Sequence, residues 1–142
     1  MENDTNFEPS DTVRVSRRLD APPERVWRAL TDGEELAAWY WPQSLQPSAT
    51  VDLRTGGRYR ISSAATGMAV SGDYHEVSAP RRLVESWQWD GEDITSLVTI
   101  DLSGDDEHTD VVVIHERLAA EAVAAHHQGW SDCLDRLPGH LA

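Results

Sequence analysis

The stretch VAAHHQGWSDCLDRL, residues 123–137, decides the fold of this chain. Its apolar and aromatic side chains recur every three or four residues, which is the period of one helix face. We predict a long helix over about residues 118–137, ended by Pro138 and Gly139. Gly129 in mid-helix costs about 1 kcal/mol relative to Ala, which a close approach or space for a ligand would explain. The buried face of the helix would carry Val123, His126, Trp130, Cys133, Leu134 and Leu137.

Residues 50–116, which precede this helix, have the pattern of strands and turns. Thr55-Gly56-Gly57 marks a hairpin, because glycine adopts positive φ at little cost. Consecutive short strands joined by tight turns are typical of an antiparallel meander, one face of which must be covered. We predict strands around Tyr59 and Ile61 and over residues 68–77, 83–89, 94–102 and 111–115, with a polar turn over residues 104–108.

Two short helices are predicted between a first strand, residues 12–19, and the meander. Pro22 fits the first turn of the first helix, since its missing N–H costs nothing there. Asp32 and Glu35 form a D-x-x-E variant of the capping box, which would start the second helix and carry it through Ala38. Pro42 would stop it. The chain thus reads as an α+β protein, with residues 1–10 a flexible tail and residues 11–142 a single domain.

The charge balance is strongly acidic. There are 25 acidic residues against 12 basic ones, a formal net charge of −13, and every basic residue is Arg. Such a charge favours solubility and costs self-repulsion, a balance used in salt-rich cytoplasm. Salt adaptation is therefore one interpretation, and an ordinary acidic protein is the other. Nucleic acid is not expected as a partner, because phosphate binding needs a concentrated basic surface.

Cysteine usage and hydropathy indicate the compartment. Cys133 is the only cysteine, so no internal disulfide can form and a reducing environment is the simplest interpretation. We expect its thiol to be buried and structural. The first eleven residues lack the basic start and apolar run of a signal peptide. No apolar run approaches membrane-spanning length, so we predict a cytoplasmic protein without membrane insertion.

The order of these elements resembles the START-like helix-grip superfamily, also called SRPBCC or the birch-pollen-allergen fold. Within it, the chain resembles the homologues of the heat-shock-protein-90 ATPase activator. The resemblance covers nearly the whole chain after the tail, and it rests on the order and spacing of several short motifs. They are APPERVW at 21–27, LAAWYWP at 36–42, DLRTGGR at 52–58, and the stretches 72–89 and 126–137.

The resemblance implies a curved antiparallel sheet of six to seven strands wrapped around the long C-terminal helix. It also implies a cavity between sheet and helix that often holds an apolar ligand. Members bind hydrophobic molecules, catalyse ring-forming or hydrolytic reactions, or regulate chaperones, so the fold does not fix the function. A homodimer is compatible with this fold, and a chaperone is a third kind of partner to consider beside a ligand or a substrate.

Our first hypothesis is a binding domain for a hydrophobic or aromatic small molecule, without a cofactor. Large aromatic rings dominate pocket energetics, and the six tryptophans are the best candidates. The consecutive rings of Trp39, Tyr40 and Trp41 cannot all face one way, so one or two of them would line the opening. The predicted lining consists of Trp39, Trp41, Tyr59, Trp87, His115, His126 and Trp130.

The second hypothesis is an enzyme of the cyclase or hydrolase type. His115 is a candidate general base because its pKa lies near neutrality, against the alternative of a satisfied core histidine. Glu85 is a candidate acid if the face of Leu83 and Trp87 is interior, and a surface charge if Val84 points inward; alternation leaves both open. No metal site is expected, since neighbouring helical histidines point about 100° apart.

Overall fold

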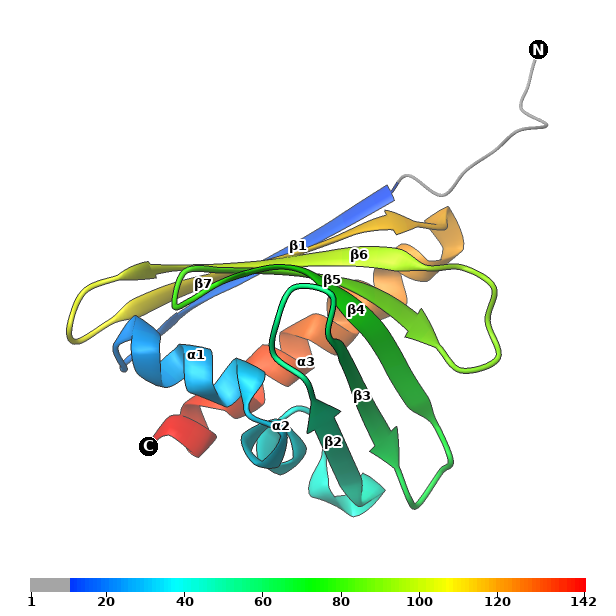
Figure 1. Ribbon diagram of the computed structural model, residues 1–142, viewed down its shortest axis with the longest axis horizontal. Helices are drawn as coiled ribbons and strands as arrows, with labels where there is room; N and C mark the ends of the chain where they lie inside the picture. Colours follow the sequence, from blue (N-terminus) through cyan, green and yellow to red (C-terminus); the bar gives the residue numbers. More distant parts are fainter. Residues whose placement is uncertain (1–10) are drawn as a thin grey trace, which may run out of the picture.

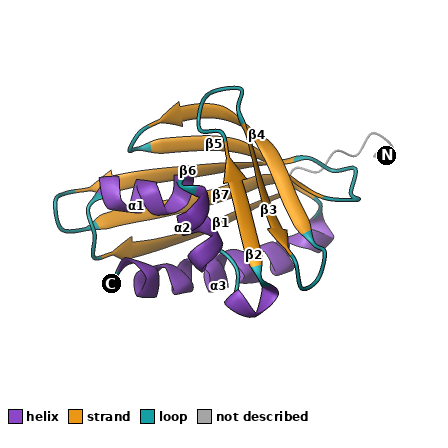
Figure 2. Cartoon of the chain, turned by 60° about the horizontal axis from the view of Figure 1, so that its bottom comes forward, coloured by secondary structure: helices purple, strands orange, loops and turns teal. Residues whose placement is uncertain are grey.

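The computed structural model describes residues 11–142, which form a seven-stranded antiparallel sheet with three α-helices on one side (Figures 1 and 2). The sheet bends around α3, which runs along its inner face (Figure 1). This confirms the predicted α+β helix-grip architecture. The predicted tail, residues 1–10, lies outside the described residues.

The strands follow in the order β1-β7-β6-β5-β4-β3-β2 across the sheet. They are β1 (Asp11–Leu19), β2 (Pro47–Val51), β3 (Arg58–Ser63), β4 (Ala69–Ser78), β5 (Arg82–Trp89), β6 (Ser96–Gly104) and β7 (Thr109–Leu118). The helices are α1 (Pro23–Thr31), α2 (Gly33–Trp39) and α3 (Val123–Leu141), with short 3-10 turns η1 (Gln43–Leu45) and η2 (Ala120–Ala122). None of the helices within residues 11–142 is long and apolar enough to cross a membrane.

The inner face of the sheet follows from simple alternation along the strands. In β7, Thr109, Val111, Val113 and His115 are buried, while the side chains between them are half-exposed. The same alternation in β6 buries Val98, Ile100 and Leu102. Ile94 was expected to join that face, but β6 begins only at Ser96 and Ile94 stays exposed.

One glycine permits a close approach between β4 and β5. A Cβ on Gly72 would lie 1.8 Å from the carbonyl oxygen of Ser86, so no other residue fits without moving the strands apart. The same carbonyl accepts a hydrogen bond of 2.7 Å from the Tyr59 hydroxyl. Gly72 therefore sits where β3, β4 and β5 are tied together by a side chain as well as by backbone pairing.

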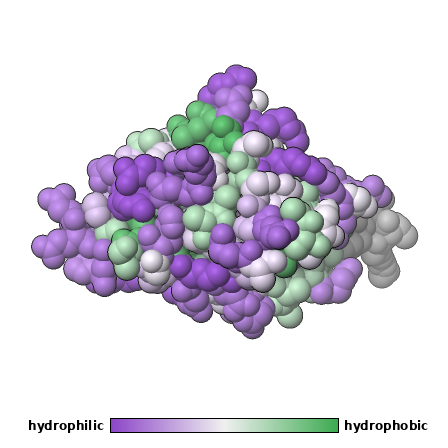
Figure 3. Space-filling model, turned by 90° about the horizontal axis from the view of Figure 1, so that it is seen from below, coloured by the Kyte–Doolittle hydropathy of each residue, from purple (hydrophilic) through white to green (hydrophobic). Residues whose placement is uncertain are grey.

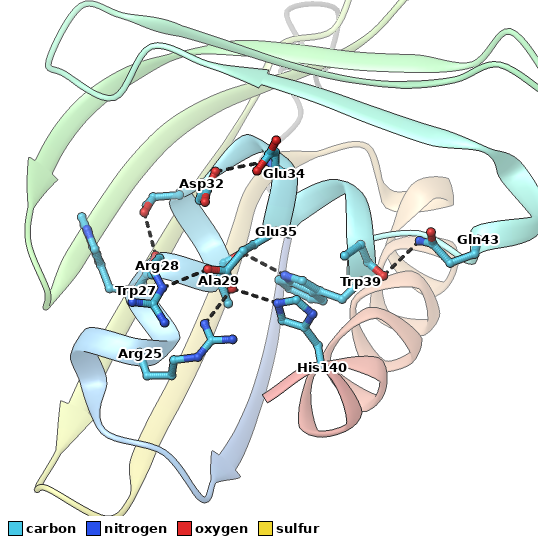
Figure 4. Close-up of polar contacts among 12 residues, drawn as sticks. Arg25, Trp27, Arg28, Ala29, Asp32, Glu34, Glu35, Trp39, Gln43 and His140 are labelled. Carbon is cyan, nitrogen blue, oxygen red and sulfur yellow. Dashed lines mark hydrogen bonds and ion pairs between the residues drawn. The ribbon is translucent and has the colours of Figure 1, made fainter. Parts of the chain in front are cut away.

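Asp32 starts α2, but Glu35 does not complete a capping box. The Asp32 carboxylate accepts from the backbone N–H of Glu34, as an N-cap residue does. Glu35 instead accepts hydrogen bonds from Arg25 and Arg28 of α1, and its carboxylate also lies 2.9 Å from the ring of His140 on α3 (Figure 4). Glu35 thus joins all three helices.

The long helix differs from the prediction at both ends. β7 continues to Leu118 and η2 follows, so α3 begins at Val123 rather than near residue 118. The predicted stop at Pro138 and Gly139 is wrong, because α3 runs on to Leu141. Proline so near a C-terminus removes one intrahelical N–H, and the contacts of the last turn with the core offset that loss.

Candidate functional site

A pocket of about 380 Å³ lies between α3, the end of β5 and the segment that follows α2. Its volume falls at the small end of the range of roughly 300–1,000 Å³ that is typical of small-molecule sites. Most of the lining is apolar or aromatic. It consists of Tyr40, Trp41, Pro42, Leu45, Met68, Trp87, Trp89, Ala125, His126, Gly129, Trp130, Asp132, Cys133 and Arg136.

The aromatic rings of the pocket wall pack on one another. Trp41 and Trp89 are stacked, with 6.0 Å between ring centroids and 14° between planes. Trp87 meets Trp89 edge to face at 4.8 Å, and it meets His126 in the same way at 5.1 Å. Edge-to-face and offset pairs of this kind are favourable beyond their buried area. The rings of the wall therefore hold one another in place.

His115 lies behind this wall and is fully buried. The Trp130 indole donates to His115 Nδ1 at 3.0 Å, so Nδ1 carries no proton and the neutral ring must carry its proton on Nε2. Nε2 then donates to Ser96 Oγ at 2.6 Å, and that hydroxyl donates to the Trp87 carbonyl. Both ring nitrogens are thus used.

Burial, helped by the neighbouring His126, lowers the pKa of His115 to about 3. The ring is therefore neutral near pH 7, and the lone pair that a general base would need accepts a hydrogen bond from Trp130. These contacts make His115 a residue that orients Trp130 and Trp87, in the manner of a satisfied core histidine.

Glu85 faces the interior, which settles the orientation of its strand. Leu83, Glu85 and Trp87 are all buried, while Val84 is half-exposed. Burial raises the pKa of Glu85 to about 8, although the nearby Tyr59 hydroxyl opposes the shift. The space beside the carboxyl is only about 10 Å³, which is room for about one water molecule. Glu85 is a perturbed acid without room for a substrate.

The residues predicted to share one cavity divide into two groups. Trp41, Trp87, His126 and Trp130 line the pocket. Trp39, Tyr59 and His115 lie outside it, among the buried residues of the core. Trp39 donates its indole N–H to the Ala29 carbonyl at 2.8 Å and joins α1 to α2 (Figure 4).

Two polar residues of the lining, Asp132 and Arg136, are absent from the predicted set, although Gly129 on the same helix was expected to leave space for a ligand. Gly129, Asp132 and Arg136 stand at helical spacing i, i+3 and i+7, so one face of α3 carries all of them. This spacing was a usable signal, but it lies beside the apolar stripe that drew the prediction. Burial raises the pKa of the neighbouring Cys133 thiol to about 12, which keeps that lining residue unreactive. Within residues 11–142, no cluster of three His, Cys, Asp or Glu side chains could hold a metal ion.

Comparison with known proteins agrees with the fold. The sequence profile of the family described as "Activator of Hsp90 ATPase homolog 1-like protein" matches residues 20–142. A structure from Chromobacterium violaceum is 28% identical with a TM-score of 0.78, covering 92% of this chain and 96% of that one. CalU16 from Micromonospora echinospora is 28% identical with a TM-score of 0.76, covering 94% and 77%.

A third similar structure is described as an HSP90 activator from Plasmodium falciparum. It is 25% identical with a TM-score of 0.75, and the match covers 92% of this chain and 95% of that one. No curated protein matches the sequence significantly.

Proposed function

Because this chain belongs to the Activator of Hsp90 ATPase homolog 1-like family, within the SRPBCC/START-like superfamily, we propose that it binds an apolar or aromatic small molecule beside α3. The observation that carries the proposal is the aromatic lining of the pocket, where Trp41, Trp87 and Trp130 converge from three separate parts of the chain. A concave apolar site with a few polar groups is the usual form of a small-molecule site.

Gly129 supports the proposal independently. A glycine inside a helix costs about 1 kcal/mol relative to alanine, so it needs a compensating reason. Close packing is not that reason, because a Cβ at Gly129 would meet no atom within 4 Å. The missing side chain instead leaves space in the pocket, which Gly129 lines.

Filling that space tests the proposal. We expect Gly129→Leu to weaken the binding of the apolar fluorescent probe N-phenylnaphthylamine by about tenfold, which is about 1.4 kcal/mol. The matched control is Gly139→Leu, a second helical glycine with open space around it that does not line the pocket. Binding is followed by quenching of tryptophan fluorescence. Equal loss in both variants, or no loss in either, would contradict binding at this pocket.

Regulation of a chaperone is a second candidate function. It is favoured by the similarity to the structure described as an HSP90 activator, which the match covers almost completely. The test is the ATPase rate of purified Hsp90 with and without the chain. Stimulation that survives Gly129→Leu would separate this activity from the ligand pocket, and no stimulation at saturating protein would remove the second candidate.

A further inference from the structure

Arg136 differs from the other arginines in its surroundings. Within residues 11–142, eight arginines have a carboxylate oxygen within 4.0 Å. Of the remaining four, Arg14, Arg81 and Arg117 are exposed to solvent. Arg136 is half-buried, lines the pocket and has no carboxylate partner among the described residues. In a chain with about twice as many carboxylates as arginines, this absence calls for a reason.

Two backbone carbonyls hold the guanidinium in place. Arg136 Nε donates to the Trp39 carbonyl at 3.1 Å, and Nη2 donates to the Tyr40 carbonyl at 2.7 Å. These two hydrogen bonds also cap the end of α2. A guanidinium presents its N–H groups as rigid forks on separate edges. The edge formed by Nε and Nη2 is occupied by the two backbone carbonyls. The edge formed by Nη1 and Nη2 keeps its N–H donors for a planar acceptor.

The charges around the pocket leave Arg136 as its fixed cation. Burial lowers the pKa of His126, so that ring is neutral near pH 7. Asp132 stands one helical turn before Arg136, yet it accepts from Gln128 at 2.8 Å instead of pairing with the guanidinium.

We propose that the ligand of this pocket is an aromatic or apolar carboxylic acid whose carboxylate pairs with Arg136. This inference rests on the proposed binding function and names the chemical class of the ligand. The apolar body would lie against the rings of Trp41, Trp87 and Trp130, while the carboxylate would take the open guanidinium edge in a bidentate pair.

Desolvation favours an acid over a neutral ligand. Any ligand that fills the pocket removes water from the Arg136 guanidinium. A neutral apolar molecule would leave those N–H groups without acceptors, which is costly for a charged group. A carboxylate replaces the lost water with charge-assisted hydrogen bonds, so the anion should bind more tightly than its neutral amide.

The test compares naphthoate with its neutral isostere naphthamide by isothermal titration calorimetry on the folded chain. We expect the wild-type protein to bind naphthoate at least tenfold more tightly than naphthamide. Arg136→Gln should remove that preference. The matched control is Arg14→Gln, which removes the same charge from an exposed arginine outside the pocket and should keep the preference.

The outcomes separate the two proposals. Equal binding of both probes to the wild-type protein, or a preference that survives Arg136→Gln, overturns the carboxylate inference and leaves the pocket function standing. Absence of binding by either probe overturns both. The wild-type comparison needs no variant, so the inference stays testable even if loss of the α2 cap prevents Arg136→Gln from folding.

Discussion

Glu85 is a buried carboxyl group that has no cationic partner among the described residues. Its folded-state pKa of about 8 lies above the ordinary value of 4.5. Between these values the folded chain binds a proton that the unfolded chain has released, so stability falls as the pH rises through this window. Below about 4.5 this penalty is absent, and above about 8 it is complete.

We therefore predict that Glu85→Gln flattens the pH dependence of stability. Relative to wild type, the variant should gain on the order of a few kcal/mol at about pH 8.5 compared with about pH 5. Urea unfolding at the two pH values measures this difference. Glu107→Gln, which removes an exposed carboxylate, is the control and should show no such change. Parallel stability curves for Glu85→Gln and wild type would mean that the carboxyl stays ionised in the folded chain.

At the scale of single residues, the sequence shows which residue types could line a pocket, but it does not show which of those residues do. The resemblance to the helix-grip fold, which implies a cavity between sheet and helix, led to the inclusion of Trp41, Trp87, His126 and Trp130 in the predicted lining, and these four line the pocket. The sequence could not separate Trp39 from Trp41, since the choice depends on whether a carbonyl such as that of Ala29 lies within reach of the indole N–H. Such partners come from the tertiary arrangement, which alternation and periodicity do not contain.

At the scale of elements, Glu35 holds α1, α2 and α3 together (Figure 4). Its carboxylate bonds Arg25 at 2.6 Å and Arg28 at 2.9 Å, and lies 2.9 Å from the ring of His140. Burial acts to raise the pKa of Glu35, but the hydrogen bonds from His140, Arg25 and Arg28 outweigh it and the pKa is lowered. Its stabilising contribution is therefore present near neutrality and is lost as the pH falls through that lowered pKa.

We predict that Glu35→Gln lowers the free energy of unfolding by about 1–2 kcal/mol near pH 7, because hydrogen bonds to a charged group are lost. The matched control is Glu34→Gln, the preceding residue on α2, whose exposed side chain points away from this cluster (Figure 4). Urea unfolding of both variants checks the difference. A loss for Glu34→Gln as large as that for Glu35→Gln would assign the effect to charge at the start of α2 instead.

Most element bounds could be predicted, because strand alternation and helix periodicity are local signals. The end of α3 could not. Pro138 and Gly139 are stop signals in an isolated helix, whereas here the last turn is held by Leu141 against the core and by His140 beside Glu35. Tertiary contacts thus override a local preference of a few kcal/mol.

At the scale of the whole molecule, acidic residues outnumber the basic residues that could pair with them. The surface seen from below is mostly hydrophilic, with smaller hydrophobic areas between (Figure 3). Exposed ion pairs such as Arg18–Asp110 and Arg60–Asp90 use some carboxylates, but 25 acidic residues face 12 basic ones. Exposed pairs contribute little each, so the unpaired excess dominates the field of the molecule.

This excess predicts that salt stabilises the fold. Raising KCl from about 0.1 M to about 1 M shortens the Debye length from about 10 Å to about 3 Å and screens the self-repulsion. We expect the free energy of unfolding to rise by about 1 kcal/mol, a few degrees in Tm. Scanning calorimetry or circular dichroism melts over this salt range measure it. The surface ion pairs act in the opposite direction, so a stability that falls with salt would show that they outweigh the net charge.

Variants that change the net charge in opposite directions test whether net charge causes this salt effect. The exposed turn between β6 and β7 carries Asp106 and Glu107, and neither side chain has an ion-pair partner among the described residues. The double change Asp106→Asn and Glu107→Gln should raise Tm at low salt and lose that advantage at about 1 M KCl, because screening removes the repulsion it relieves. Arg14→Gln makes the chain more acidic and should shift Tm the other way. If Tm shifts in the same direction in both variants, or if the shifts do not depend on salt, local contacts and not net charge cause the effect.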